Sequence, residues 1–320
     1  MAKGLREIKN RIKAVKNTAQ ITRAMQLVAS SKMKRAQDTA VGGREYRRLL
    51  ADMLSGSLAL VGEDFSHPLC TPREVKKRGI VLVTTDKGLC GGLNSNVLRQ
   101  VAELLPKPGQ AGATVMGLDD GVLGEAAKLP AAGVAFVTVG RKAAQYVSRM
   151  GGELLADFHV SDRAHFSEVR AIVGFLLQQY LDGDIDTVEV IYPQFRNTLI
   201  QTPTHAHLLP ITDLALRAVE MRSKLGAPSS GCAGDLCSMI FEPSVSGVLN
   251  ELPPLFFKEE LHQMILEAKA SEHSARMVAM KAATDNAKKI AHALTLDYNK
   301  ARQAAITQEI LEITAAAAGA

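Results

Sequence analysis

The sequence predicts two long helices, one at each end of the chain, that pair as an antiparallel coiled coil with an α/β domain inserted between them. Three observations predict this fold class. Residues 5–41 and 255–318 contain neither glycine nor proline, the residues that most disfavour a helix interior. Both stretches repeat apolar or small residues at helical spacing. The chain between them alternates β-branched runs with amphipathic segments, which is typical of a Rossmann-like, largely parallel sheet.

The N-terminal helix carries a heptad seam, which is the condition for a left-handed coiled coil. Many seam residues are small or polar, so little apolar area is buried at about 25 cal/mol per Å², and the pair is weak without other proteins around it. Gly42-Gly43 interrupts the pattern and is expected to bend the helix. We expect this coiled-coil region over residues 1–60. The seam consists of Ile8, Ile12, Val15, Ala19, Thr22, Gln26, Ala29, Met33, Ala36 and Ala40.

An α/β domain is expected over residues 76–210. Short runs rich in β-branched residues predict its buried strands, and amphipathic segments between them predict its helices. Ser161 or Asp162 is a candidate cap for the last helix. The expected strands are Ile80–Thr85, Ala113–Met116, Val134–Val139 and Thr187–Tyr192, with an extended piece at Thr198–Thr202 that ends at Pro203; the expected helices are Ser95–Leu105, Arg141–Met150 and His165–Leu181.

Residues 211–244 have a looser pattern and predict an inserted loop or hairpin, with a helical fragment at Asp213–Lys224. Pro243, Pro253 and Pro254 are expected to precede the final helix, which is assigned to residues 255–320. A continuous helix over residues 255–318 would be roughly 90–95 Å long at 1.5 Å per residue, so it must protrude from the domain. Its apolar stripe is Leu261, Ile265, Ala268, Ala275, Ala279, Ala283, Ala287, Ile290, Leu294, Ala301 and Ala305.

Composition is that of a soluble globular protein, with 47% hydrophobic and 22% charged residues in a chain of 320. No apolar run approaches the 18 or so residues of a membrane span, and the N-terminus lacks the core of a signal peptide. A cytosolic or peripheral protein is expected. The cysteines have no framework spacing, which fits a reducing compartment; they are Cys70, Cys90, Cys232 and Cys237.

Positive charge is concentrated at the N-terminal end, where residues 1–48 hold thirteen lysines and arginines against three acidic residues. Three interpretations are open: a solvated basic face, a nucleic-acid surface, or a surface for an acidic protein partner. Interleaved aromatics, zinc-ligand spacing and helix-turn-helix punctuation are missing, which weakens the nucleic-acid interpretation. A basic coiled-coil scaffold for nucleic acid remains the alternative from another functional class.

Candidate chemistry is sparse. The turn DKGLCGGLN at Asp86–Asn94 follows a strand and precedes a helix, as phosphate-binding loops do, but it matches neither common nucleotide-binding motif. A tight structural turn is expected there, with Cys90 as a buried thiol. His205 and His207 are weak evidence for a metal, and no carboxylate pair suits acid–base catalysis. The sequence therefore predicts no catalytic, cofactor or metal site.

Four segments together resemble the gamma subunit of the rotary F-type ATP synthase: IKNRIKAVKNTAQITRAMQLVASSKMKRAQ, TTDKGLCGGLNSNV, YPQFRNTLIQTPT, and SEHSARMVAMKAATDNAKKI with YNKARQAAITQEILEI. The resemblance implies a central rotor shaft inside a ring of alpha and beta subunits, with the α/β foot on the membrane c-ring beside the epsilon subunit. Such a shaft couples proton flow to ATP synthesis or hydrolysis without an active site of its own. It implies no nucleic acid, no membrane span, and a peripheral location on the cytoplasmic face of the bacterial inner membrane or an equivalent membrane.

The resemblance also implies roles for particular residues. Contacts that couple the shaft to the beta subunit would come from Met25, Lys32, Arg302, Gln303, Thr307 and Glu309. Cys232 and Cys237 lie where photosynthetic gamma subunits carry an insertion, which in chloroplast forms holds a regulatory dithiol. Their spacing differs from the chloroplast pattern, so a redox pair, a metal half-site and an incidental pair all remain open.

Overall fold

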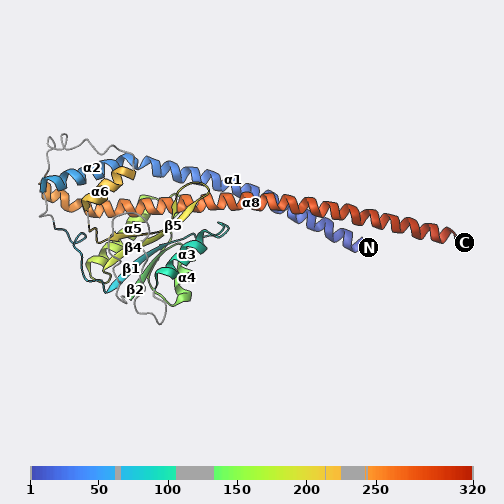
Figure 1. The fold of residues 1–320 in the computed structure, drawn as a ribbon, viewed down its shortest axis with the longest axis horizontal. Coiled ribbons are helices and arrows are strands. Elements are labelled where there is room, and N and C mark those ends of the chain that lie inside the picture. Colours follow the sequence, from blue (N-terminus) through green and yellow to red (C-terminus); the bar gives the residue numbers. More distant parts are fainter. Residues whose placement is uncertain are drawn as a thin grey trace.

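The computed structural model describes residues 2–61, 66–105, 133–212, 214–224, 242 and 244–318. Two long helices, α1 (Ala2–Gly42) and α8 (Val245–Ala318), run antiparallel along the molecule, and both chain termini lie at the same end (Figure 1). A five-stranded sheet with its helices packs beside α8 near the opposite end. We call the paired α1 and α8 the shaft, and the sheet with its helices the foot.

The predicted interruption at Gly42-Gly43 is confirmed. Helix α1 ends at Gly42, and α2 (Arg44–Val61) begins after Gly43. Backbone bonds Gly43 N to Thr39 O (3.3 Å) and Arg47 N to Gly43 O (3.1 Å) keep the helical pattern on both sides. Figure 1 shows the chain changing direction between the two helices. Glycine has no Cβ and is costly in a helix interior, so the break falls where the sequence predicts it.

The sheet has the strand order β3-β2-β1-β4-β5. Neighbours among the first four strands are parallel, and β5 runs antiparallel to β4. This arrangement confirms the predicted α/β fold with a largely parallel sheet. The strands are β1 (Lys77–Val83), β2 (Gly133–Val139), β3 (Glu153–Phe158), β4 (Thr187–Phe195) and β5 (Gln201–Leu209).

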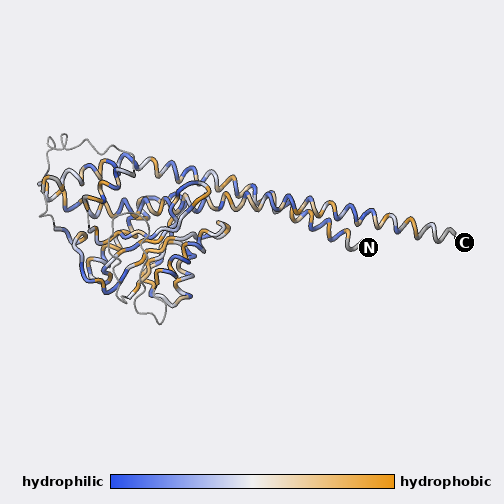
Figure 2. Tube along the Cα trace, in the orientation of Figure 1, coloured by the Kyte–Doolittle hydropathy of each residue, from blue (hydrophilic) through white to orange (hydrophobic). Residues whose placement is uncertain are grey.

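Helices cover both faces of the sheet, because successive strand residues point to opposite sides. On one face, Ile80 and Leu82 of β1 pack with residues of α3 (Leu93–Leu104) and α4 (Arg141–Met150). On the other face, Val81 joins the larger core formed by α5 (Phe166–Leu181) and the first half of α8. Figure 2 shows the hydrophobic residues gathered in this part of the molecule, whereas along the shaft they alternate with hydrophilic ones.

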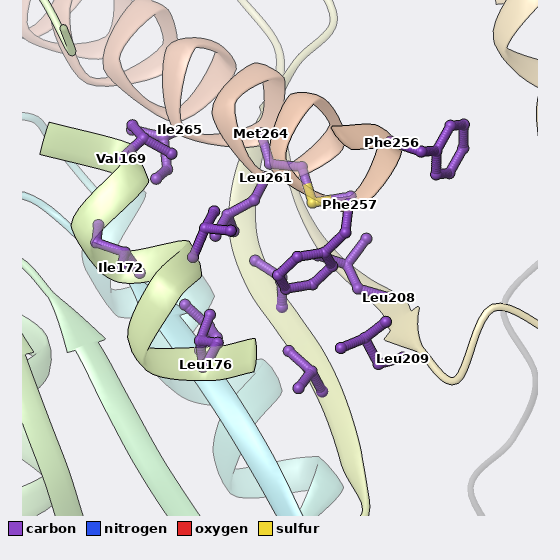
Figure 3. Packing of buried hydrophobic residues seen from close by; sticks show 14 of the residues in the cluster. Val169, Ile172, Leu176, Leu208, Leu209, Phe256, Phe257, Leu261, Met264 and Ile265 are labelled. Atoms are coloured by element: carbon purple, nitrogen blue, oxygen red, sulfur yellow. The ribbon is translucent and has the colours of Figure 1, made fainter. Parts of the chain in front are cut away.

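Helix α8 is part of the core of the foot. Phe257, Leu261 and Ile265 are at most 1% exposed. They lie between α5, which contributes Ile172 and Leu176, and the end of β5 (Figure 3). The shaft helix is therefore built into the foot rather than attached to its surface.

Two features of the sheet differ from the prediction. Strand β3 was not expected; its sequence ELLADF lacks β-branched residues, and its pairing with β2 at the sheet edge forms the strand. Strand β5 covers Gln201–Leu209 and runs through Pro203, so the extended piece predicted at Thr198–Thr202 was misplaced. An edge strand tolerates proline, because the missing N–H is not needed on its open side. The predicted cap was also wrong: His165 occupies the N-cap of α5, and Glu168 accepts hydrogen bonds from the amide and hydroxyl of Ser161.

The final helix begins at Val245, ten residues before the predicted start, and Pro253 and Pro254 lie inside it. A proline interior to a helix leaves the carbonyl four residues earlier without its amide donor. For Pro254 that carbonyl belongs to Asn250, and the ring of His67 hydrogen-bonds to the backbone of Asn250. The prediction that these prolines precede the helix was therefore wrong, and at Pro254 a partner distant in sequence compensates for the lost bond.

The predicted looser segment contains α6 (Leu214–Lys224), which buries Leu214, Ala218 and Met221 beside α2. This first part of the segment is a packed helix rather than a loop. Residues 225–241 and the strand predicted at Ala113–Met116 lie outside the described residues. Among the helices that the structure describes, none is long and apolar enough to cross a membrane.

Candidate functional site: the shaft and its junction with the foot

The predicted seam of α1 is confirmed in full. Each of its ten positions is buried or half-buried against α8, and Thr22, Ala29 and Ala36 are buried. Thr22 and Thr284 share a hydrogen bond of 2.7 Å between their hydroxyls, which fixes the register of the two helices. The seam is thus narrow and rich in small or polar side chains, as the sequence indicates.

The facing seam of α8 differs in part from the predicted stripe. Ile290, predicted to lie in the stripe, is 51% exposed, whereas its neighbour Ala291 is 7% exposed. Alanines occur on several faces of this helix, so composition alone does not select the buried one. One row of buried and half-buried positions alternates at spacings of four and three, as a coiled coil requires, with the half-buried Ala283 and Thr295 beside it. The row is Met280, Thr284, Ala287, Ala291, Leu294, Tyr298, Ala301 and Ala305.

The end of α8 extends beyond the end of α1 (Figure 1). Counting from the Thr22–Thr284 pair along antiparallel helices places Ala2 opposite about residue 304. Ile306, Ile310 and Leu311 follow residue 304 and therefore lie past the end of α1. Their side chains are 44%, 54% and 62% exposed. The tip of the shaft therefore presents an uncovered helix with apolar side chains on its surface.

The structure separates the six predicted coupling residues into two groups. Arg302, Gln303 and Thr307 are exposed near the tip, and Glu309 lies in the same helix, although its side chain is outside the description. The other two, Met25 and Lys32, are half-buried on α1. The register of the helices puts them roughly 30 Å or more from the tip group, at 1.5 Å per residue.

The glycine-rich turn packs against the shaft. Leu89 and Gly91 have positive φ values of 65° and 60°. Arg276 of α8 donates to the carbonyl oxygens of Lys87 and Gly88 at 3.3 and 3.4 Å. Cys90 is 2% exposed and packs with Leu93 and Ala275, which supports the predicted structural role of the turn and its thiol.

Of the two histidines considered as metal ligands, His205 takes part in a buried ion-pair network, and His207 is on the same strand two residues further on. Arg78 donates two hydrogen bonds to the carboxylate of Glu189, and His205 Nε2 lies 2.6 Å from Glu189 Oε2. Burial raises the pKa of Glu189, but these partners more than compensate and bring it to about 2. Burial lowers the pKa of His207 below its usual value. In the described part of the chain, no three His, Cys, Asp or Glu side chains gather as metal ligands would.

Cys232 and Cys237 lie outside the described residues. Their pairing therefore stays a prediction.

A junction between foot and shaft was not predicted from the sequence. The loop between β3 and α5 reaches both helices of the shaft through Asp162, which lies 2.5 Å from Lys32 Nζ of α1 and 3.6 Å from His273 Nε2 of α8. In the same loop, the carbonyl of Ala164 lies 3.1 Å from His262 Nε2 of α8. In the sequence, Asp162 was noticeable only as a candidate helix cap, which does not indicate a contact with the shaft.

A slender antiparallel pair of helices that is built into a small α/β domain is the architecture of a stalk protein. Such a protein connects the larger parts of a multi-subunit complex. The comparisons agree with this class. The family model described as ATP synthase matches residues 4–319. The ATP synthase gamma chain of Opitutus terrae is 49% identical over 313 residues, and that of Methylacidiphilum infernorum is 39% identical over 316, each alignment covering 97% of both chains. This chain belongs to the ATP synthase gamma chain family.

Solved structures agree on the fold. The rotor of the Euglena gracilis mitochondrial ATP synthase aligns over 96% of this chain and 100% of that chain, with a TM-score of 0.59 and 16% sequence identity. The family expected from the four sequence segments is thus confirmed, together with its fold.

Proposed function

We propose that this chain is the central rotor shaft of an F-type ATP synthase. It couples proton flow through a membrane c-ring to ATP synthesis or hydrolysis in a hexamer of alpha and beta subunits. The observation that carries the proposal is the shaft itself, since a long seam rich in small and polar side chains buries little apolar area and ends in an exposed apolar tip. Such a structure is stable when other subunits surround it.

The shape of the shaft suits this role. Helix α8 continues past α1, and α1 bends into α2, so the shaft has no rotational symmetry about its own axis (Figure 1). An asymmetric axle turning in a ring of three equivalent sites presents a different surface to each site in turn. The chain itself contributes no catalytic group; nucleotide chemistry belongs to the beta subunits.

Charge supports the choice of partner. The lysines and arginines of α1 other than Lys32 are exposed wherever their side chains are described, for example Arg11, Lys16 and Arg23. Opposite charge on a partner speeds encounter and selects the correct partner. We infer that acidic loops of the beta subunit face α1, and that Met25, Arg302, Gln303, Thr307 and Glu309 supply the coupling contacts. The sixth predicted residue, Lys32, is paired with Asp162 of the same chain.

Each segment of the chain has its own role in this proposal. We propose that residues 1–60 and 255–320 form the axle and that residues 76–210 form the foot, which sits on the c-ring beside the epsilon subunit, with 211–244 as an added segment. We propose that the chain lies peripherally on the cytoplasmic face of a bacterial inner membrane or of an equivalent energy-transducing membrane.

The test is recovery of the complex. A tagged chain is purified from membranes solubilised in mild detergent, with the untagged chain as the control, and the eluate is assayed for partners and ATPase activity. We expect alpha, beta, epsilon and c subunits with magnesium-dependent ATPase activity. Recovery of the chain alone would reject the rotor assignment. Tight, salt-dependent binding of the isolated chain to duplex DNA would favour the nucleic-acid scaffold instead.

A further inference from the structure

The loop between β3 and α5 joins three segments that are far apart in sequence. Asp162 uses its two carboxylate oxygens for two different helices: Oδ2 accepts a hydrogen bond from Lys32 Nζ of α1, and Oδ1 faces His273 Nε2 of α8. Burial acts to raise the pKa of Asp162, but the hydrogen bond from Lys32 and the charges of His273 and Lys269 lower it overall. The carboxylate is therefore ionised at neutral pH. It accepts a hydrogen bond from α1 and lies 3.6 Å from His273 Nε2 of α8, a ring whose own pKa is lowered by burial.

A second attachment lies next to the first. His262 of α8 meets the carbonyl of Ala164, and its ring packs edge-on against Phe166, with centroids 5.3 Å apart. Ala164 is 1% exposed and has a φ of 45°. A positive φ is strained for a residue with a Cβ, and such strain persists only where the surroundings hold the backbone in place. The loop is thus held firmly against α8.

Helix α1 needs such a tie. Many of its seam residues are small or polar, so the seam buries little apolar area, and the contacts of α1 lie mainly along α8. Lys32 is the side chain of α1 whose ion pair reaches the foot among the described residues. The pair adds to two other constraints on α1: the hydroxyl bond between Thr22 and Thr284, and the packing of the following helix α2 into the core around Phe257 and Leu261.

We propose that Asp162 is a positioning residue that clasps the foot to both shaft helices, so that foot, α1 and α8 turn as one body. The proposal rests on the proposed rotor function and adds the route by which torque passes between foot and shaft. It assigns Lys32 to an internal contact, in place of a contact with the beta subunit.

The experiment uses the assembled complex in membrane vesicles and measures ATP hydrolysis and ATP-driven proton pumping on the same preparation. The variants are Asp162→Lys, Lys32→Asp and the double exchange, which restores opposite charges in reversed order. We expect each single reversal to lower the pumping obtained per ATP hydrolysed by about two-fold or more, since a partly exposed pair of attracting charges becomes a repelling one. The double exchange is expected to recover most of the loss.

Asp182→Lys is the matched control, because Asp182 is an exposed carboxylate of the same foot at the end of α5. It is expected to leave the pumping ratio unchanged. If the reversals do not assemble, Asp162→Asn gives the test, since it removes the charge and keeps the volume; an unchanged ratio in this variant overturns the clasp. A double exchange no better than the single reversals also overturns it.

Two further outcomes separate the clasp from other assignments. If Lys32→Met lowers the pumping obtained per ATP hydrolysed while Asp162→Asn leaves it unchanged, Lys32 contacts a partner subunit and the clasp is rejected. Wild-type vesicles that contain the chain but hydrolyse and pump nothing would reject the rotor function itself.

Discussion

Helix α8 packs in two different ways along its length. In the foot it buries large side chains such as Phe257, Leu261 and Ile265, whereas in the shaft it buries Ala287 and Ala291. Large apolar side chains remove much surface from water, and each contributes about 1.5–3 kcal/mol. Alanines let two helices approach closely but contribute far less. The foot can therefore stabilise itself, while the shaft relies on what surrounds it.

The largest expected effect tests the foot. Phe257→Ala should lower the free energy of unfolding of the purified chain by about 3–5 kcal/mol, because the ring fills the space between α8 and the end of β5 and a cavity replaces it. Urea unfolding followed by circular dichroism measures the change. Ile290→Ala, on the exposed side of α8, is the control and should change stability by at most about 0.5 kcal/mol. A loss below about 1 kcal/mol for Phe257→Ala would contradict the distinction between the two halves of α8.

The second effect is a pH dependence in the foot. The folded pKa of Glu189 is about 2, below the ordinary 4.5, because the bonds from His205 and Arg78 outweigh the effect of burial. The network therefore stabilises the fold above about pH 4.5, and this contribution, on the order of 3 kcal/mol, is lost as the pH falls toward about 2.

Urea midpoints measured between about pH 6 and pH 3 should fall with acid in the wild-type chain, and less steeply in Glu189→Gln. Because Arg78 and Glu189 are both buried, the variant should also be less stable at neutral pH. Equal slopes for the two proteins would show that Glu189 does not carry the acid sensitivity of the foot.

A smaller effect is expected in the shaft. Thr284→Ala removes the hydrogen bond to Thr22 and should destabilise the pairing by about 1 kcal/mol, measured as faster amide hydrogen exchange in α1. Thr295→Ala is the matched control, since the hydroxyl of Thr295 bonds to Ala291 O of its own helix. Equal acceleration in the two variants would mean that the bond across the seam contributes nothing.

The smallest effect on stability is expected at the tip, where the effect on function should be large. Gln303→Leu and Thr307→Val alter exposed side chains, so the free energy of unfolding should change by at most about 0.5 kcal/mol. ATP-driven proton pumping by the assembled complex should nevertheless fall. Gln178→Leu is the control: it makes the same glutamine-to-leucine substitution on the exposed side of α5 and should leave proton pumping unchanged. Normal pumping in both tip variants would remove these residues from the coupling contacts.

The seams of α1 and α8 show how well a sequence pattern predicts which positions of a helix are buried. In α1 the apolar and small residues recur on one face, so the heptad spacing alone identified all ten positions. In α8 the alanines occur on several faces, and the predicted stripe passed through the half-buried Ala279 and Ala283 and the exposed Ile290. Met280 and Thr284 lie on the face that meets α1. The difference arises because the alanine pattern of α8 is compatible with more than one buried face. In such a helix, packing against the partner helix decides which face is buried.

By itself, the sequence determined that a long helix stands at each end of the chain, the alternation of strands and helices in the foot, and the family. These are local properties, set by the absence of glycine and proline and by side-chain periodicity. The tertiary structure decided the edge strand β3, the position of Pro253 and Pro254 inside α8, and the meeting of Lys32, Asp162 and His273. Each of these depends on residues far apart in the chain, such as Lys32 and Asp162 at a separation of 130 positions, and no local pattern records which distant segments will pack together.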